Sequence, residues 1–360
     1  MHIYKILILS IFSLFVLTGY AQSRETDITD KFDKDFLEAL VEKGVLNNKN
    51  IVRIADVDTI TTLDISYRDL TYILGIEYFK SLIKLDCSMN ELTNPDFGAN
   101  LNLELLDCSG NQLTHLDVSK NIKLKKLSCL DNQLKKLDLP NSLNFKVLVC
   151  DNNELKDLNL SNILNLTDLY CNNNHLSQLE ISENLKIKEL HCNNNQLSHL
   201  DISKNENLEK LSCTNNQLKE LSLYNNLSII RVHCNDNILI HLDVSKNMKL
   251  EELICSHNHL KELDLPNSLN FKNLVCNNNQ LSQLEISKNT ELDALHCDSN
   301  QLSQLDTSKN TKLEWLYCAD NQLKELDLSN NLNLKILYCV GNKLENLDLS
   351  KNKKLERIYE

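Results

Sequence analysis

A cysteine recurs every 21 residues through most of this 360-residue chain, from Cys87 to Cys339. Asparagine stands three residues after every one of these thirteen cysteines, and leucine stands five residues after each. Leucine also stands two residues before each cysteine, except at Val232. A fixed period of roughly 20 to 50 residues indicates stacked structural units rather than one irregular core. The chain is therefore expected to form a repeat structure.

The phrase Leu-x-Cys predicts a short strand in every unit. Alternate residues of a strand share a face, so Leu316 and Cys318 are expected to point inward, and Trp315 and Tyr317 outward. Each unit then adds one strand to a parallel sheet, with equivalent residues about 4.8 Å apart. The asparagine after each strand is expected to turn inward and bond to backbone groups of the bend. Stacked neighbours bury the core that one unit alone could not.

The repeated phrase L-x-x-L-x-C-x-x-N resembles that of the leucine-rich repeat proteins, in their bacterial subclass with 21-residue repeats. The resemblance implies a leucine-rich repeat solenoid, shaped as an arc or superhelix. It also implies a parallel β-sheet on the concave face, with short strands or turns on the convex side. The coil over residues 63–82 is longer, since Leu63 lies 22 residues before Leu85, and it resembles the first coils of internalin-like proteins.

A second asparagine position closes most repeats, but Ser142, Ile163 and Ser268 occupy it in three of them. In each exception an asparagine stands one residue earlier, which predicts that the turn is shifted rather than lost. The segment LDLPNSLNFK occurs at 137 and again at 263, which suggests duplication of a block of repeats.

The segments before the repeats have compositions of their own. Residues 1–21 are typical of a secretory signal peptide, with Lys5, an apolar run from Ile6 to Leu17 and small residues before Gln22. Residues 22–60 are predicted to form a helical capping segment. Phe32, Phe36, Leu37, Leu40 and Val41 would share a helical face there, and Gly44 would end the helix. Residues 61–360 form the predicted repeat domain of one 22-residue coil and thirteen 21-residue repeats.

The charge of the chain bears on its partners. Asp and Glu number 50 against 38 Lys and Arg, a net charge of −12. This excess argues against nucleic acid and anionic membranes as main partners, because both attract clustered basic residues. With the signal peptide removed, no membrane insertion is expected. The predicted locations are the periplasm, the cell surface or the extracellular medium.

Two columns of equivalent residues could have a chemical role. The cysteines are expected to pack as small apolar residues, since no C-x-x-C metal motif occurs and an odd number suits a disulfide ladder poorly. An outward acidic column is expected to bond to its own turns, with a Ca²⁺ ladder as the alternative. Its members are Asp96, Asp117, Asp138, Glu180, Asp201, Asp243, Asp264, Glu285, Asp306, Asp327 and Asp348.

The outward positions of the Cys strands vary freely, so the fold does not dictate them and they are available for recognition. The candidate binding residues there are Tyr170, His191, His233, His296, Trp315, Tyr317, Ile336 and Tyr338. Aromatic residues are common interface anchors, although they also favour strands. His191 and His233 lie two coils apart, roughly 10 Å, which is too far for one metal site.

No arrangement typical of catalysis or cofactor binding occurs in the sequence, so neither a catalytic residue nor a cofactor is predicted. The leading interpretation is an exported, non-enzymatic scaffold that binds another protein, or else a glycan, on its concave face. The alternative is a structural or adhesive surface module without a dedicated site. End-to-end contact at the uncapped last coil is a further possibility for self-association.

Overall fold

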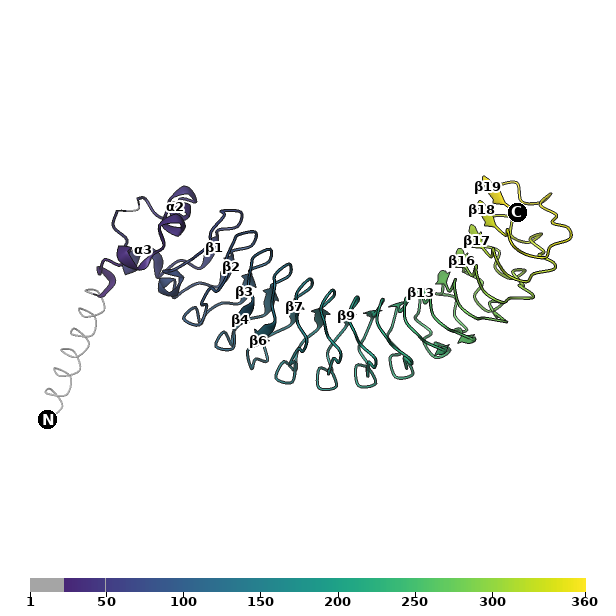
Figure 1. Ribbon diagram of the computed structural model, residues 1–360, viewed down its shortest axis with the longest axis horizontal. Coiled ribbons are helices and arrows are strands. Elements are labelled where there is room, and N and C mark those ends of the chain that lie inside the picture. The colour runs from purple at the N-terminus through teal and green to yellow at the C-terminus, as the bar shows by residue number, and fades with distance from the viewer. Residues whose placement is uncertain (1–22, 49) are drawn as a thin grey trace, which may run out of the picture. The chain divides into compact units, whose positions relative to one another are not determined.

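The computed structural model describes residues 23–48 and 50–360, so the predicted signal peptide at 1–21 lies outside the described residues. The chain divides into two compact units, one of Met1–Phe145 with Asn152–Glu154 and one of Lys146–Asp151 with Leu155–Glu360. Each unit is built of coils that carry one main strand apiece and stack in parallel (Figure 1). The predicted leucine-rich repeat solenoid is confirmed.

Short helices precede the coils of the first unit: η1 (Thr29–Lys31), α2 (Lys34–Glu42) and α3 (Ile54–Val57), with η2 (Ile76–Tyr78) inside the first coil. Helix α2 begins because the side chain of Asp33 accepts hydrogen bonds from two backbone N–H groups of the first turn. It ends at Glu42, and Gly44 two residues later, with a φ of +70°, closes the turn as predicted.

The apolar face of α2 differs slightly from the prediction. Phe32 precedes the helix rather than belonging to it, because Asp33 already caps the first turn. Val41 is half-buried, and Ala39 is buried in its place. The ring of Phe36 lies 5.8 Å from that of Phe32 and 6.2 Å from that of Phe79, centroid to centroid. The helix therefore packs onto the first coil, while a capping role for residues 22–60 stays a prediction.

The main sheet of the first unit contains β1 (Thr62–Asp64), β2 (Lys84–Asp86), β3 (Leu105–Asp107) and β5 (Lys126–Ser128). Leu63 pairs with Leu85, which places the longer first coil in register with the rest. A separate pair, β4 (His115–Asp117) and β6 (Lys136–Asp138), lies on another side of the coils.

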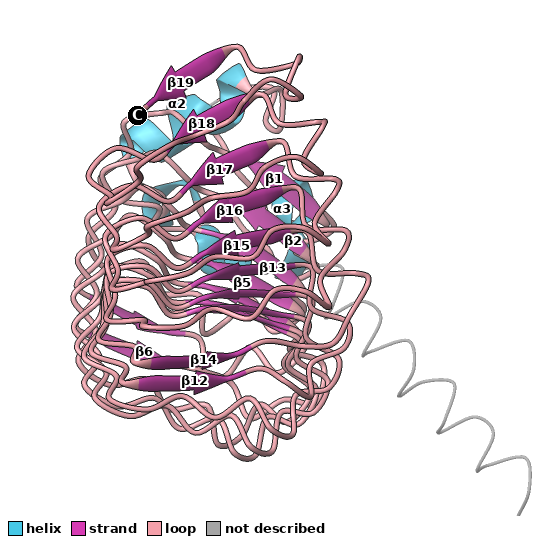
Figure 2. Cartoon of the chain, turned by 90° about the vertical axis from the view of Figure 1, so that its right-hand side faces the viewer, coloured by secondary structure: helices cyan, strands magenta, loops and turns pink. Residues whose placement is uncertain are grey.

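The main sheet of the second unit is longer and equally regular. Its strands are β7 (Val147–Val149), β8 (Asp168–Tyr170), β9 (Glu189–His191), β10 (Lys210–Ser212), β11 (Arg231–His233), β13 (Glu252–Ile254), β15 (Asn273–Val275), β16 (Ala294–His296), β17 (Trp315–Tyr317), β18 (Ile336–Tyr338) and β19 (Arg357–Tyr359). Figure 2 shows these strands stacked, with β12 (His241–Asp243) and β14 (Glu262–Asp264) as a separate pair.

The interior is apolar, as predicted. The middle residue of each main strand up to β18 is at most 2% exposed, and every cysteine is buried. Burial raises the pKa of the Cys213 thiol to about 12. The cysteine column therefore serves as core packing.

The asparagine three residues after each cysteine links neighbouring coils. The Nδ2 of Asn216 donates to the carbonyls of Cys213 and Cys192, at 3.1 and 3.0 Å. Its Oδ1 accepts the N–H of Leu197, in the preceding coil, at 3.0 Å. These bonds satisfy backbone groups that the bend would otherwise bury unpaired, which confirms the prediction.

The prediction of a shifted turn is wrong at Ile163, whose backbone keeps the regular turn bonds, whereas the turns at Ser142 and Ser268 do differ from the regular one. Ser142, Ile163 and Ser268 occupy the same buried column as the second asparagine, and the asparagines before them are exposed. The hydroxyl of Ser142 donates to the carbonyl of Ile122, and that of Ser268 to the carbonyl of Met248. In these two repeats a hydroxyl thus replaces the amide within an altered turn.

The residue two positions after each cysteine adopts a positive φ, which the sequence analysis did not anticipate. The residues of this left-handed column are Met89, Gly110, Asp131, Asn152, Asn173, Asn194, Asn215, Asp236, His257, Asn278, Ser299, Asp320 and Gly341. Asn, Asp and Gly tolerate this conformation best, and they hold most of the column. The frequency of Asn, Asp and Gly at this position is therefore the sequence signal from which the positive φ could have been predicted.

The acidic column bonds to its own turns, as expected. The N–H of Ser203 donates to Asp201 at 2.9 Å, and the N–H of Ser308 donates to Asp306 at the same distance. These bonds lower the pKa of both carboxyls. Where proline replaces that serine, the carboxylate pairs across the separate strands instead, as His115 with Asp138 at 2.7 Å.

Candidate recognition surface on the main strands

The first and third residues of each main strand face away from the core and form a surface that we call the strand face. In the second unit the strand face lies on the inner side of the curve that the coils follow (Figure 1). All eight candidate residues lie on it. Tyr170 is on β8, His191 on β9, His233 on β11, His296 on β16, Trp315 and Tyr317 on β17, and Ile336 and Tyr338 on β18.

Four rings stack along the third position of the last coils and form what we call the aromatic column: His296, Tyr317, Tyr338 and Tyr359. Successive ring centroids are 4.2, 4.7 and 4.1 Å apart, with planes within 18° of parallel. The parallel register brings the rings together, because it aligns equivalent positions of adjacent strands. The column therefore presents ring edges and hydroxyl groups outward, while the ring faces cover one another.

Trp315 lies beside this column, in the first position of β17. Its strand neighbours in register are Ala294 and Ile336. The Nζ of Lys335 lies 5.7 Å from the centroid of the indole and 2.7 Å from a carboxylate oxygen of Glu314. The indole is half-buried and already holds a cation on its face.

Tyr170 and His191 form a second ring pair, with centroids 4.8 Å apart and planes at 16°. The Tyr170 hydroxyl donates to Glu189 at 2.8 Å, and Lys210 Nζ reaches the other oxygen of Glu189 at 2.6 Å. Burial and the carboxylate of Glu189 raise the pKa of Tyr170 to about 12. This pair is a structured polar cluster, separate from the aromatic column.

His233 has a different environment from the other candidates. Its Nε2 lies 2.6 Å from Glu252 Oε1, and Asn273 donates to the second oxygen of that carboxylate. Ser212 separates His233 from His191 in the column. The two histidines therefore belong to different clusters, and neither shares a contact with the aromatic column.

Tyr359 was missing from the sequence candidates. Its signal was present, because Ile358 is in register with Leu337 and the next residue must then continue the column of Tyr338. The structure places Tyr359 on the aromatic column, 46% exposed. The candidate surface is one coil longer than predicted.

A second apolar feature was also missed. In the turn after the second asparagine, exposed side chains recur at the 21-residue spacing, and we call this row the turn ridge. In the second unit its members are Leu164, Leu185, Leu227, Met248, Leu269 and Leu332, between 43% and 67% exposed. Glu206, Thr290 and Thr311 interrupt the row, and the ridge lies away from the strand face.

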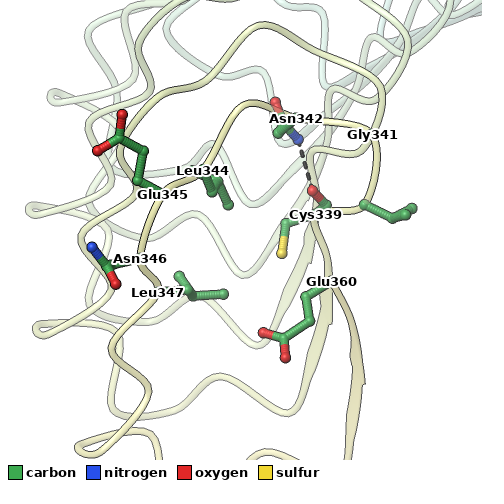
Figure 3. Close-up of a pocket in the computed structure, with 9 residues that line it drawn as sticks. Cys339, Gly341, Asn342, Leu344, Glu345, Asn346, Leu347 and Glu360 are labelled. Atoms are coloured by element: carbon green, nitrogen blue, oxygen red, sulfur yellow. Dashed lines mark hydrogen bonds between the residues drawn. The ribbon is translucent and has the colours of Figure 1, made fainter.

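A cavity of about 280 Å³ opens in the last coil (Figure 3). Its walls include Cys339, Leu344, Leu347 and Glu360, and Asn342 donates to the Cys339 carbonyl at 2.8 Å. Leu344 and Leu347 are half-buried, whereas Leu323 one coil earlier is fully buried. The core is thus least covered in this coil.

The described residues carry neither of two features that would indicate other functions. No helix within 23–48 and 50–360 is both long enough and apolar enough to cross a membrane. Over the same residues, no group of three or more His, Cys, Asp or Glu side chains is arranged to hold a metal ion.

Comparison with known proteins identifies structures with a similar fold. No family model matches the chain, and no curated protein sequence does. Among solved structures, the chain is similar to the functional domain of InlJ from Listeria monocytogenes, described as including a cysteine ladder. The two are 30% identical, with a TM-score of 0.74 over 88% of this chain and 76% of that one.

Two further structures share the architecture. The internalin InlF from Listeria monocytogenes matches over 92% of this chain and 96% of its own, with 22% identity and a TM-score of 0.73. YopM, described as a leucine-rich effector protein from Yersinia pestis, matches over 84% of this chain and 83% of its own. Its identity is 25% and its TM-score 0.56.

The parallel coils, the buried leucine and cysteine columns and the asparagine bonds define a leucine-rich repeat solenoid. The chain belongs to the leucine-rich repeat proteins, in the bacterial subclass with 21-residue repeats that includes internalin-like proteins.

Proposed function

We propose that the protein is an exported, non-enzymatic scaffold that binds another protein through the strand face of its last coils. The observation that carries this proposal is the aromatic column beside Trp315 and Ile336. Aromatic side chains bring large contact area at low entropic cost, and they dominate the binding energy of many interfaces. Solenoids of this family offer extended concave surfaces of the same kind.

A protein partner fits the column better than a glycan. Binding of a sugar ring would use open aromatic faces, but the faces of Tyr317 and Tyr338 are covered by their neighbours. The exposed edges and hydroxyls suit the mixed apolar and polar surface of a protein. The backbone beneath is fixed by the asparagine bonds, so the rings are held in place before binding, which reduces the entropic cost of association.

The experiment is an affinity capture from culture medium and cell-envelope fractions. It compares the wild type with the double variant Trp315→Ala/Tyr317→Ala. The matched control is Tyr224→Ala/Leu227→Ala, which removes exposed apolar side chains, 67% and 55% exposed, from the turns instead. We expect the control to recover the same partner as the wild type and the strand-face variant to lose it.

Equal recovery by both variants would favour a structural or adhesive module without a dedicated site. Export rests on residues 1–21 and is tested by N-terminal sequencing of protein recovered from the medium or envelope. A mature chain that begins at Gln22 is expected. A hydrolytic activity that copurifies and disappears on a single substitution would overturn the non-enzymatic assignment.

A further inference from the structure

The aromatic column has carboxylates along both of its edges. Asp293 and Glu314 precede β16 and β17, while Asp298 and Asp320 follow the cysteines of the same two coils. Glu314 pairs with Lys335 at 2.7 Å. None of the ion pairs in the described part of the chain includes Asp293, Asp298 or Asp320. On one side of the rings, Lys335 and Lys272 therefore lie near the carboxylates of Glu314 and Asp293, whereas Asp298 and Asp320 on the other side have no ion pair among the described residues.

The carboxylates of Asp293 and Asp298 are partly withdrawn from water and form no ion pair with the residues that the structure describes. Burial raises the pKa of Asp298, and the nearby charge of Asp320 raises it further against the opposing effect of His296 and His257. Burial likewise raises the pKa of Asp293, with Glu314 adding to the rise and Lys272 opposing it. In both cases the ionised form is disfavoured, and a cation placed alongside would stabilise it.

The ammonium group of Lys335 already lies on this surface and shows how the surface holds a cation. The Lys335 ammonium lies between the indole of Trp315 and the carboxylate of Glu314. An aromatic face and a carboxylate each attract lysine and arginine side chains. On the other edge, Asp298 and Asp320 have no such ammonium.

The two edges are too far apart for one charged group. Asp293 and Asp298 flank β16 and lie five residues apart, which corresponds to about 16 Å between their Cα atoms if the chain is extended at roughly 3.3 Å per residue. A ligand that satisfies both edges must carry at least two separated positive charges, with material between them that lies over the rings.

We propose that the aromatic column and its acidic edges bind a positively charged, extended peptide segment of the partner, with lysine or arginine side chains on the carboxylates and apolar groups on the rings. This inference rests on the proposed function and specifies its partner. The net charge of −12 would also draw a basic partner toward the protein from a distance.

The test measures fluorescence anisotropy with two labelled twelve-residue peptides, one alternating lysine with serine and one alternating glutamate with serine. The proteins are the wild type, Asp293→Asn/Asp298→Asn, and the control Glu325→Gln/Glu345→Gln. Both variants lose two negative charges, but the control residues are exposed on the other half of the coils. Circular dichroism of each variant checks that the fold is kept.

We expect the wild type to bind the lysine peptide and not the glutamate peptide. The edge variant should weaken binding by about tenfold, and the control by less than about twofold. An equal loss in both variants would show diffuse attraction to net charge and overturn the inference. So would preference for the glutamate peptide, or no binding of the lysine peptide.

The affinity capture separates failure of this inference from failure of the proposed function. If Asp293→Asn/Asp298→Asn retains the partner that Trp315→Ala/Tyr317→Ala loses, the strand face binds a protein but the charge assignment is wrong. If both variants retain the partner, the proposed function itself is wrong.

Discussion

The imidazole of His296 lies flat against the ring of Tyr317, with centroids 4.2 Å apart and planes at 15°. Burial lowers the pKa of His296, and the nearby carboxylate of Asp298 only partly opposes this effect. The neutral imidazole is therefore the form that belongs to the aromatic column.

This arrangement predicts a pH dependence of stability. The unfolded chain binds a proton at His296 near pH 6.5, whereas the folded chain binds it only at lower pH. The free energy of unfolding should therefore decrease as the pH falls below about 6.5. The check is urea unfolding across this range for the wild type and His296→Gln, with NMR titration of the imidazole. A His296 that titrates above 6.5, or an identical pH dependence in the variant, would contradict the prediction.

The coil-linking asparagines should be costly to replace. Asn216→Ala removes an acceptor for one buried N–H and a donor to three carbonyls, one of them in the preceding coil. Unpaired buried groups of this kind cost about 1–3 kcal/mol each, so we expect a loss of roughly 3 kcal/mol in the free energy of unfolding. Gln217→Ala, on the exposed next residue, is the control and should change stability by less than about 0.5 kcal/mol. Thermal unfolding followed by circular dichroism measures both.

The left-handed column predicts a stabilising substitution. Ser299 has a φ of +53°, a conformation that costs most residues about 1 kcal/mol and glycine almost nothing. Ser299→Gly should therefore raise the free energy of unfolding. The same exchange at Ser282, an exposed residue without positive φ, should lower it. A lower stability of Ser299→Gly would show that the hydroxyl matters more than the backbone.

The buried thiols predict an order of chemical labelling. Iodoacetamide reacts with the thiolate, and burial raises the pKa of both Cys213 and Cys339. Cys339 nevertheless borders the open cavity of the last coil, whereas Cys213 is completely buried. Peptide mapping of the native protein should find Cys339 modified first and Cys213 unmodified until denaturant is added. Early modification of Cys213 would contradict its place in the core.

Much of the fold was predictable because thirteen repeats report the same pattern. Leu316 and Cys318 could be assigned to the core, and Asn321 to the bend, from their columns alone, and the structure confirms all three. At Ser142 the sequence shows a lost asparagine but not that a hydroxyl bonds to the preceding coil in its place.

The candidate surface was only partly predictable. Alternation along a strand places Trp315 and Tyr317 outward, but stacking of Tyr317 on its neighbours depends on side-chain torsions that no spacing reveals. The edge carboxylates were missed for a related reason. Asp293 and Asp298 lie in different columns, and their places on either side of β16 follow only from the strand bounds.

The asparagine bonds also bear on how such a chain changes length during evolution. The asparagine three residues after each cysteine forms hydrogen bonds to the preceding coil. Its bonding partners are equivalent carbonyl and N–H groups from repeat to repeat. A gene segment that encodes whole coils can therefore be copied or removed while every junction keeps its bonding partners. The two LDLPNSLNFK segments, at 137 and 263, fit such an event, since 263 − 137 = 126 is six times 21 residues. Length is thus a trait that selection can adjust in whole-coil steps without redesigning the core.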